Sequence, residues 1–301
     1  MSAPPDPRRR TSTQRVTTWR DGVATERDDL LIGEEPAQIA VAGPDQQQIE
    51  VAVTMRTPGN DEELAVGFLV SESLIAPSDV LRVSFGDPLH TSQPENHILV
   101  RLRTSFDAAR IPARTTVATA SCGICGKASL DDVAQRLGRV EKIPRISGAS
   151  LLQLPDQLRG AQDLFESTGG LHAAAAVSVA DLFESTGGLH AAAAVSVAAD
   201  GSLQIGTVRE DVGRHNAVDK LIGEAALRGA LPLASSLLLL SGRCSFELVQ
   251  KAAAAGFAAI ACVGAPSSLA VETAERLGIC LIGFLRERSF NVYTEQGAVQ
   301  S

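Results

Sequence analysis

The sequence predicts an α/β protein in which a small β-rich N-terminal part precedes a larger part of alternating strands and helices. In the N-terminal third, turn residues separate short segments of alternating apolar residues, a pattern typical of strands. From about residue 205 onward, apolar strands, Gly/Ser loops and helical patterns follow one another, which indicates a sheet covered on both faces. The chain has 301 residues, 45% of them hydrophobic, and is long enough for one large domain or two ordinary ones.

The N-terminal elements follow from the local pattern. Residues 1–20 are rich in Pro, Arg and Thr without an apolar stretch, so we expect a disordered tail and not a secretory signal. Residues 21–120 are expected to form the β-rich subdomain, with Asp61 capping a helix over 62–74 after the turn at 57–60. The predicted strands of this subdomain are 38–41, 49–55, 98–103 and 114–118.

Residues 121–301 are expected to form the α/β domain. Asp200-Gly201 predicts a hairpin between strands near 191–198 and 202–209. The other predicted elements are helices at 127–138, 148–162, 246–255 and 269–277 and strands at 236–240, 258–263 and 279–284. Because these strands alternate with helices, we expect a parallel sheet that binds ligands where its strands end, at loops 241–245 and 264–268.

This domain contains a tandem duplication. Residues 163–180 read DLFESTGGLHAAAAVSVA, and residues 181–198 repeat the same letters. Two copies do not make a solenoid, which needs at least three stacked units. We expect one copy to occupy the native position and the other to form an extra loop or edge segment. The identical sequences leave open which copy does which.

A pair of thiols in a glycine-rich turn, Cys122 and Cys125 within residues 121–127, is the most reactive motif. Two sulfurs at this spacing can share a proton, a disulfide, a metal or a transferred sulfur atom, and Lys127 favours the thiolate form. A zinc site would need two further ligands at suitable spacing, and no second C-x-x-C motif is present. A zinc deaminase would need an H-x-E motif, which this sequence lacks. A thioredoxin-like site usually has aromatic and proline residues beside its cysteines, and these are missing here. The residues favour thiol chemistry, with a metal site or a structural turn as open alternatives.

Three regions carry groups suited to an anionic ligand. The motif at 210–220 combines glycine, arginine and histidine, although a capped helix with a solvated acidic face would explain its carboxylates. Loops 241–245 and 264–268 each precede a helix. The first backbone amides of these helices can bind phosphate, or the loops can serve as ordinary N-terminal caps. Two arginines after the last strand could form a cationic rim for diphosphate or lie on a solvated strand. The candidates are Arg214, His215, Arg243, Ser267, Arg286 and Arg288.

Composition limits the partners. The formal net charge of −8 disfavours non-specific binding to nucleic acid. The sequence contains no run of about 18 apolar residues, which a membrane-spanning helix would need, so no membrane contact is expected. Five scattered cysteines do not form a disulfide framework, which favours the reducing cytoplasm. The remaining cysteines are expected to be small buried side chains: Cys244, Cys262 and Cys280.

Taken together, these motifs resemble the FdhD (NarQ) family of accessory sulfurtransferases of formate dehydrogenase. The matching blocks run in order from about residue 30 to 295. They are TPG at 57–59, LAVGFL at 64–69, SCGICGKAS at 121–129, TGGLHAAA at 186–193, EDVGRHNAVDK at 210–220, SGRCSFELVQKA at 241–252, APSSLAVE at 265–272 and GFLRERSFNVYT at 283–294. The family carries one copy of the TGG-x-HAAA stretch, so the duplication is a departure from its pattern.

The resemblance implies a cytidine-deaminase-like three-layer sheet and a sulfur carrier. Such a protein takes persulfide sulfur from a cysteine desulfurase and passes it to a molybdenum cofactor with two pterin guanine dinucleotides. In such a protein the cofactor is a bound substrate, and no metal is held permanently. The sulfurated cofactor is then inserted into the formate dehydrogenase catalytic subunit. A homodimer is possible. The resemblance makes Cys122 the persulfide carrier, with Cys125 beside it.

The cofactor-binding stretch of the family falls near the C-terminus of this sequence. It matches Phe284, Leu285, Arg286, Glu287, Arg288 and Ser289. Two alternatives stay open at this point. One is a molybdenum-cofactor chaperone that binds without transferring sulfur, and the other is a zinc- or disulfide-using α/β oxidoreductase.

Overall fold

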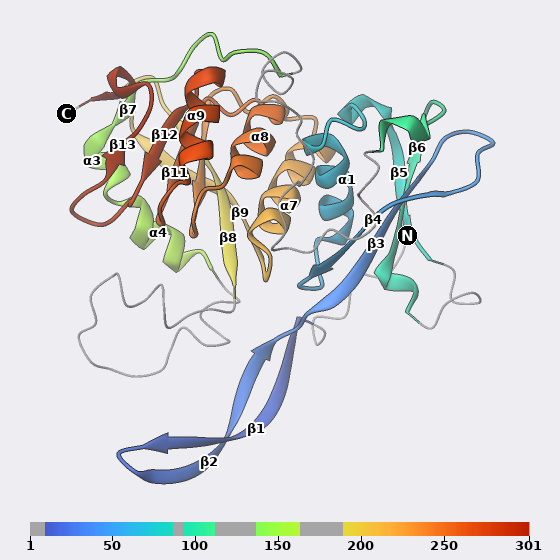
Figure 1. Ribbon diagram of the computed structural model, residues 1–301, viewed down its shortest axis with the longest axis horizontal. Helices are drawn as coiled ribbons and strands as arrows, with labels where there is room; N and C mark the ends of the chain where they lie inside the picture. Colours follow the sequence, from blue (N-terminus) through green and yellow to red (C-terminus); the bar gives the residue numbers. More distant parts are fainter. Residues whose placement is uncertain (1–9, 87–92, 112–136, 163–188, 301) are drawn as a thin grey trace.

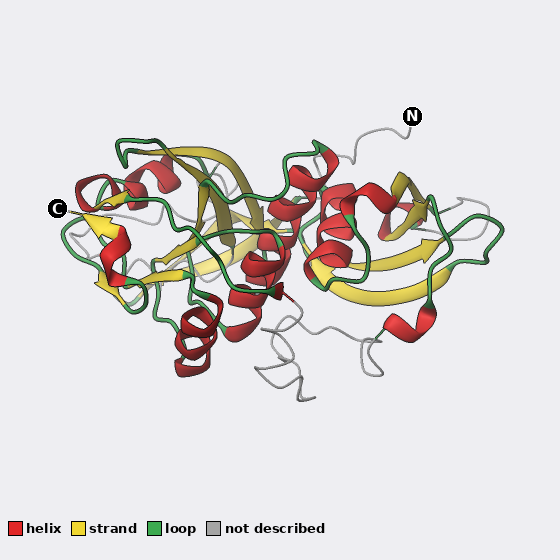
Figure 2. Cartoon of the chain, turned by 90° about the horizontal axis from the view of Figure 1, so that it is seen from above, coloured by secondary structure: helices red, strands yellow, loops and turns green. Residues whose placement is uncertain are grey.

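The computed structural model describes residues 10–86, 93–111, 137–162 and 189–300. It is an α/β structure with two main sheets, one built from the N-terminal part and one from the C-terminal part (Figure 1). Helices α1 and α7 lie between these two parts (Figures 1 and 2). The predicted strand at 114–118 and nearly all of the predicted helix at 127–138 lie outside the described residues. No helix in the described ranges is long and apolar enough to span a membrane.

The N-terminal sheet has four strands in the order β4-β3-β6-β5. Their bounds are Glu35–Ala42 for β3, Ile49–Arg56 for β4, Val80–Phe85 for β5 and His97–Leu102 for β6. Side chains alternate across the sheet, so that Ile39 and Val41 point into the core that α1 covers. The predicted strands at 38–41, 49–55 and 98–103 are therefore confirmed, with end shifts of a few residues.

Helix α1 spans Asp61–Ser71, so the prediction of a helix over 62–74 capped by Asp61 is wrong at both ends. Asp61 is the first helical residue, and its carboxylate accepts hydrogen bonds from Arg56 Nε at 2.8 Å and the Gly59 amide at 3.3 Å. The helix ends early because Ser73 adopts a positive φ of 58°. Asp61 thus fixes the preceding turn and does not cap the helix.

Residues 11–32 form a hairpin, β1 (Thr11–Arg20) and β2 (Val23–Ile32), that projects from the body (Figure 1). The expected disordered tail over 1–20 is therefore wrong for residues 11–20. Asp21 and Gly22 have φ values of 52° and 80°, the conformation that a two-residue hairpin turn requires. This Asp-Gly pair between β-branched segments was the signal for the hairpin.

The C-terminal sheet has six strands in the order β13-β12-β11-β10-β8-β9. Their bounds are His190–Val197 for β8, Leu203–Asp211 for β9, Ser236–Leu240 for β10, Ala259–Cys262 for β11, Cys280–Gly283 for β12 and Asn291–Val292 for β13. Among neighbouring strands of this sheet, only the pairs β10–β11 and β11–β12 are parallel, so the expectation of a parallel sheet holds for the centre alone. β8 pairs antiparallel with both β10 and β9, and β13 pairs antiparallel with β12. A tight turn joins β8 to β9 and a loop at 284–290 joins β12 to β13, whereas a helix at 214–227 connects β9 to β10.

Helices cover both faces of this sheet. Leu238 and Leu240 belong to the cluster with α7 (Arg214–Leu227), α8 (Phe246–Ala254) and α9 (Ser268–Leu277). Leu237 and Leu239 pack on the other face against α3 (Gly148–Leu151) and α4 (Leu154–Gly160). The predicted helix at 148–162 is thus broken in two, with Pro155 in the first turn of α4, where proline is tolerated.

Short elements complete the described chain. β7 (Ile146–Ser147) pairs in parallel with β14 (Val299–Gln300), near the C-terminus. Single turns of 3-10 helix occur at Pro77–Asp79, Pro94–Asn96, Ala108–Arg110 and Gln296–Ala298. The second copy of the duplicated segment supplies β8, at 190–197, and the first copy lies outside the described residues. The native position between β9 and β10 is therefore filled by the second copy.

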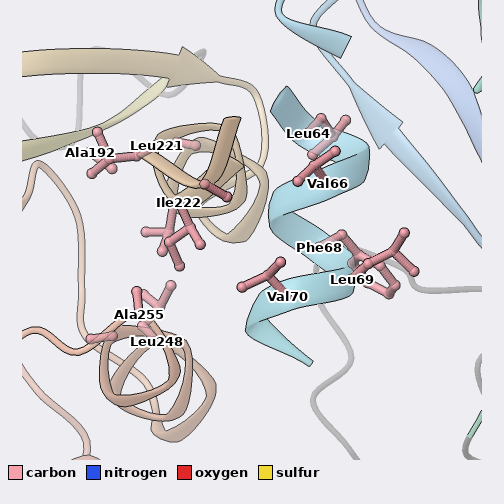
Figure 3. Packing of buried hydrophobic residues seen from close by; sticks show 14 of the residues in the cluster. Leu64, Val66, Phe68, Leu69, Val70, Ala192, Leu221, Ile222, Leu248 and Ala255 are labelled. Atoms are coloured by element: carbon pink, nitrogen blue, oxygen red, sulfur yellow. The ribbon is translucent and has the colours of Figure 1, made fainter. Parts of the chain in front are cut away.

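The two parts join where α1 crosses α7 with almost no space between their backbones. A Cβ added at Gly67 would lie 1.7 Å from the carbonyl oxygen of Asp219, and one at Gly223 would lie 1.8 Å from that of Glu63. Side chains from α1, α7 and α8 form one buried cluster around this crossing (Figure 3). The crossing fixes how the start of α7 is placed against the rest of the molecule.

Candidate functional site

The loops that follow the three parallel strands lie side by side at one edge of the C-terminal sheet. The Gly264 amide donates to the Gly242 carbonyl at 3.0 Å, and the Cys244 amide donates to the Ala265 carbonyl at 3.2 Å. The Phe284 amide in turn donates to Gly264 at 3.1 Å. The expectation that loops 241–245 and 264–268 share an edge is confirmed, and the segment after β12 joins them. The carboxyl ends of parallel strands are where such sheets bind ligands.

Helix α7 begins beside the same loops. His215 Nε2 lies 3.3 Å from Ser245 Oγ and 3.2 Å from Glu247 Oε2, and both partners stand at the start of α8. Arg214 precedes it, and its Nε atom is buried with no hydrogen-bond partner in the part of the chain that the structure describes. Arg243, in the loop after β10, is exposed. Arg214, His215 and Arg243 thus come from two distant sequence motifs and meet at one edge.

The structure adds His190, which our sequence analysis did not place among the candidates. It begins β8, and its Nδ1 atom would lie only 3.0 Å from a Cβ at Gly242, so a larger residue there would crowd the imidazole. Burial, together with the nearby charges of Arg214, His215 and Arg243, lowers the pKa of His190 to about 4. His190 is therefore a neutral imidazole among cationic groups at neutral pH. Its position within the TGGLHAAA block was the available signal.

The segment 284–289 divides into structural and exposed residues. The Arg286 guanidinium donates to the carbonyl oxygens of Val263 and, at 3.0 Å, Leu285, and so ties two loops together. The Leu285 side chain is fully buried, so any ligand contact by this residue would fall to its backbone. Glu287 pairs with Arg159 of α4 at 2.9 Å.

The exposed members of this segment remain as candidate ligand contacts. Phe284 is 43% exposed and adopts a positive φ of 51°. Arg288 and Ser289 are exposed beside it. Ser267, in the neighbouring loop, is also exposed, and its Oγ accepts a hydrogen bond from the Ala270 amide as the cap of α9. The start of α9 is therefore a capped helix terminus open to solvent.

The acidic groups of the 210–220 motif do not form a solvated helix face. Asp211 and Lys220 are fully buried and form an ion pair at 2.7 Å. Asp211 also accepts from the Thr57 amide at 3.1 Å and the Gly213 amide at 2.8 Å. Lys220 Nζ donates to the Thr57 carbonyl at 2.8 Å. The pair fixes the turn before α1 against the start of α7 and thereby places Arg214 and His215.

Three cysteines are buried, as expected. Burial raises the pKa of Cys262 and of Cys280 to about 12 and holds that of Cys244 well above its ordinary value. None of the three is a thiolate at neutral pH, so none is suited to nucleophilic chemistry. Cys122 and Cys125 lie outside the described residues. Within the described part of the chain, no group of three or more His, Cys, Asp or Glu side chains could hold a metal ion.

The sequence is similar to a known protein family and to several of its named members. The sequence model of the FdhD/NarQ family matches residues 32–181 and 177–300. The break between the two matches falls at the junction of the duplicated copies. A protein of Streptomyces avermitilis named sulfur carrier protein FdhD is 43% identical over 290 residues, which cover 94% of this chain and 93% of that protein. A protein of the same name from Mycolicibacterium paratuberculosis is 44% identical, with 94% and 97% covered.

A solved structure shares the fold. It is described as a formate dehydrogenase accessory protein from Desulfotalea psychrophila. It matches with a TM-score of 0.65 at 21% sequence identity, over 96% of this chain and 99% of that chain. This likeness concerns the arrangement of sheets and helices alone.

Proposed function

This chain belongs to the FdhD/NarQ family, and from that membership we propose that it is a sulfur carrier required for formate dehydrogenase activity. It accepts persulfide sulfur from a cysteine desulfurase on Cys122. It then transfers the sulfur to a molybdenum cofactor with two pterin guanine dinucleotides, before this cofactor enters the formate dehydrogenase catalytic subunit. The observation that carries the proposal is the convergence of three loops, a helix start and a neutral histidine at one sheet edge.

The chemistry of this edge suits the proposed cargo. Guanine dinucleotides carry diphosphate groups, and the edge offers Arg214, Arg243 and Arg288 together with the capped start of α9. Arg214 Nε lacks an acceptor, which an oxyanion would supply. The neutral imidazole of His190 can donate one hydrogen bond and accept another, as recognition of a heterocyclic base requires.

Sulfur transfer needs an accessible thiolate, which the three described cysteines do not provide. The Cys122 thiolate attacks the outer sulfur of the desulfurase persulfide. A new S–S bond forms while the old one breaks, and the desulfurase cysteine leaves as a thiolate. On delivery, the molybdenum acceptor supplies an electron pair to the outer sulfur, which becomes a sulfide ligand. The metal is oxidised by two electrons, and Cys122 leaves as a thiolate.

The carrier role is tested by mass spectrometry after incubation with a desulfurase and cysteine. One additional sulfur atom on Cys122 is expected, and Cys122→Ala should lose both this adduct and activation of the dehydrogenase. Cys244→Ala is the matched control, because that thiol is buried and should not be modified. If Cys122→Ala still activates the dehydrogenase while binding the cofactor, a chaperone that does not transfer sulfur replaces the carrier.

The cofactor seat is tested separately with guanosine diphosphate. Arg243→Glu and Arg288→Glu should each weaken binding about tenfold or more, because a charge-assisted hydrogen bond contributes roughly 1.5–3 kcal/mol. Arg276→Glu makes the same charge change in the last turn of α9 and should leave the affinity within about twofold. Equal affinity in all three variants would remove the sheet edge from the proposal. Arg286 is unsuited to this test because its loss would disturb the loops themselves.

Three further parts of the proposal rest on the family resemblance. The six-stranded sheet with helices on both faces is proposed to correspond to the cytidine-deaminase-like layers. The protein is proposed to act in the reducing cytoplasm, which is compatible with the free thiols of Cys244, Cys262 and Cys280. A homodimer is proposed, with light scattering on the purified full chain as its test.

A further inference from the structure

The N-terminal sheet has a hollow that the proposed sulfur transfer does not use. Its cavity volume is about 250 Å³, and polar side chains from three strands and the segment before β4 surround it. The polar residues that line it are Gln38, Gln48, Ser84, His97 and Arg101. The alternation of side chains places it on the sheet face opposite α1, because the buried residues of β3 and β6 point towards α1 instead.

The hollow exists because a small residue occupies the middle of the sheet face. Ala40 of β3 pairs with Leu99 of β6, and both line the floor. The other side chains of the lining are longer than that of Ala40, among them Gln38, His97 and Arg101. Gly86 closes one end, where its hydrogen atom in place of a side chain lets His97 approach: a Cβ there would lie 3.0 Å from that of His97. The floor is thus apolar and the rim is polar.

The rim carries a guanidinium group with one nitrogen that lacks an acceptor among the described residues. Arg101 Nε is buried without a hydrogen-bond partner. Arg82 of β5 lies directly opposite Arg101 across the strand pair, and like charges in this relation repel each other. None of the described residues that line the hollow is acidic. A buried donor without an acceptor, and two arginines at paired positions of neighbouring strands, are both stabilised by a bound anion.

We propose that this hollow binds a small oxyanion, a phosphate- or carboxylate-bearing molecule, at a site separate from the sheet edge that holds the cofactor. The Arg101 guanidinium pairs with the oxyanion, with Arg82 adding charge from the neighbouring strand. The side-chain amides of Gln38 and Gln48 and the imidazole of His97 supply hydrogen bonds to the remainder of the ligand. A cavity of about 250 Å³ is smaller than the sites of drug-sized ligands, which fits a compact metabolite and not a dinucleotide.

Isothermal titration of the full chain with inorganic phosphate and, separately, with citrate tests the site at constant ionic strength. The protein carries Arg243→Gln and Arg288→Gln, which weaken anion binding at the sheet edge. Saturable binding of at least one probe is expected, and Arg101→Gln should raise its Kd at least tenfold. Arg103→Gln is the matched control, since this exposed arginine lies just beyond β6, and its Kd should stay within twofold.

A second variant keeps the test decisive if Arg101→Gln does not fold. Gln48→Glu puts a carboxylate into the lining, where it competes with the ligand for the guanidinium. It should abolish anion binding while leaving the Tm without anion at least as high as that of the parent. Binding of phosphate alone identifies a phosphate-bearing ligand, and binding of citrate alone a carboxylate. No saturable binding of either probe, or unchanged affinity in Gln48→Glu, overturns the proposal.

Discussion

The crossing of α1 and α7 at Gly67 and Gly223 makes a strong prediction about what holds the two parts together. Gly67→Ala introduces a Cβ 1.7 Å from the Asp219 carbonyl oxygen, whereas real Cβ atoms essentially never approach closer than 3.0 Å. The obstacle is backbone and cannot rotate away. The helices must therefore separate by roughly the difference, 1.3 Å, or α1 must bend.

Separating α1 from α7 would weaken the polar contacts beside the crossing as well as the packing of the two helices. The same interface holds the hydrogen bond from Ser71 Oγ to Asp219 at 2.7 Å and the ion pair between Arg209 and Glu63. Overpacking of this kind costs about 1–3 kcal/mol or more, and each strained polar contact adds to it. Alanine offsets about 1 kcal/mol through its higher helix propensity. We expect Gly67→Ala to lower the free energy of unfolding by about 2 kcal/mol or more.

Urea denaturation followed by circular dichroism measures this change on the full chain. Gly160→Ala in α4 is the control, because a Cβ there would meet nothing within 4 Å. It should be neutral or stabilise the protein by up to about 1 kcal/mol. If Gly67→Ala lies within about 0.5 kcal/mol of the parent, the close crossing does not exist in solution and the derived placement of α7 is wrong.

Three further predictions concern buried charge, pH and the duplication. Lys251→Met leaves the buried Asp219 carboxylate without its cation and should cost about 3–5 kcal/mol in urea denaturation at pH 7, with most of the loss recovered by adding Asp219→Asn. His190 has a folded pKa of about 4 against 6.5 unfolded, so its neutral form stabilises the fold above pH 6.5 and less as the pH falls. The stability of the parent relative to His190→Gln should therefore drop by about 2 kcal/mol from pH 7.5 to 5, and parallel pH profiles would contradict this. Deleting 163–180, the copy that does not form β8, restores a single copy of the repeat and should leave the Tm unchanged or higher, since it shortens the connection; a lower Tm would show that both copies support the fold.

Much of the α/β half could be predicted from local sequence. The apolar runs at 236–240, 258–263 and 279–284 became β10, β11 and β12, because each run is short, apolar and bounded by turn residues. Their Gly/Ser loops then had to share one edge, since parallel strands end on the same side. Candidate ligand residues in those loops were accordingly found from the pattern alone.

The burial of charged residues and the position of His190 could not be predicted from local sequence. Lys220 and Asp219 have the composition of a solvated helix face, yet both are buried. Their partners, Asp211 for the lysine and Lys251 for the aspartate, come from other elements. His190 lies in a run of small apolar residues, and only the arrangement of strands brings it next to Gly242.

The sequence by itself determined most strands of the two main sheets and the edge at which the loops 241–245 and 264–268 lie, and it predicted Cys122 and Cys125 as the thiols for sulfur chemistry. These properties depend on neighbours a few residues apart, and periodicity records such neighbours. Only the tertiary structure decided the antiparallel flanks of the sheet, the crossing at Gly67 and Gly223, the neutral state of His190 and the second copy's position in β8. Each of these depends on which distant groups share one volume, because burial and charge act through space and not along the chain.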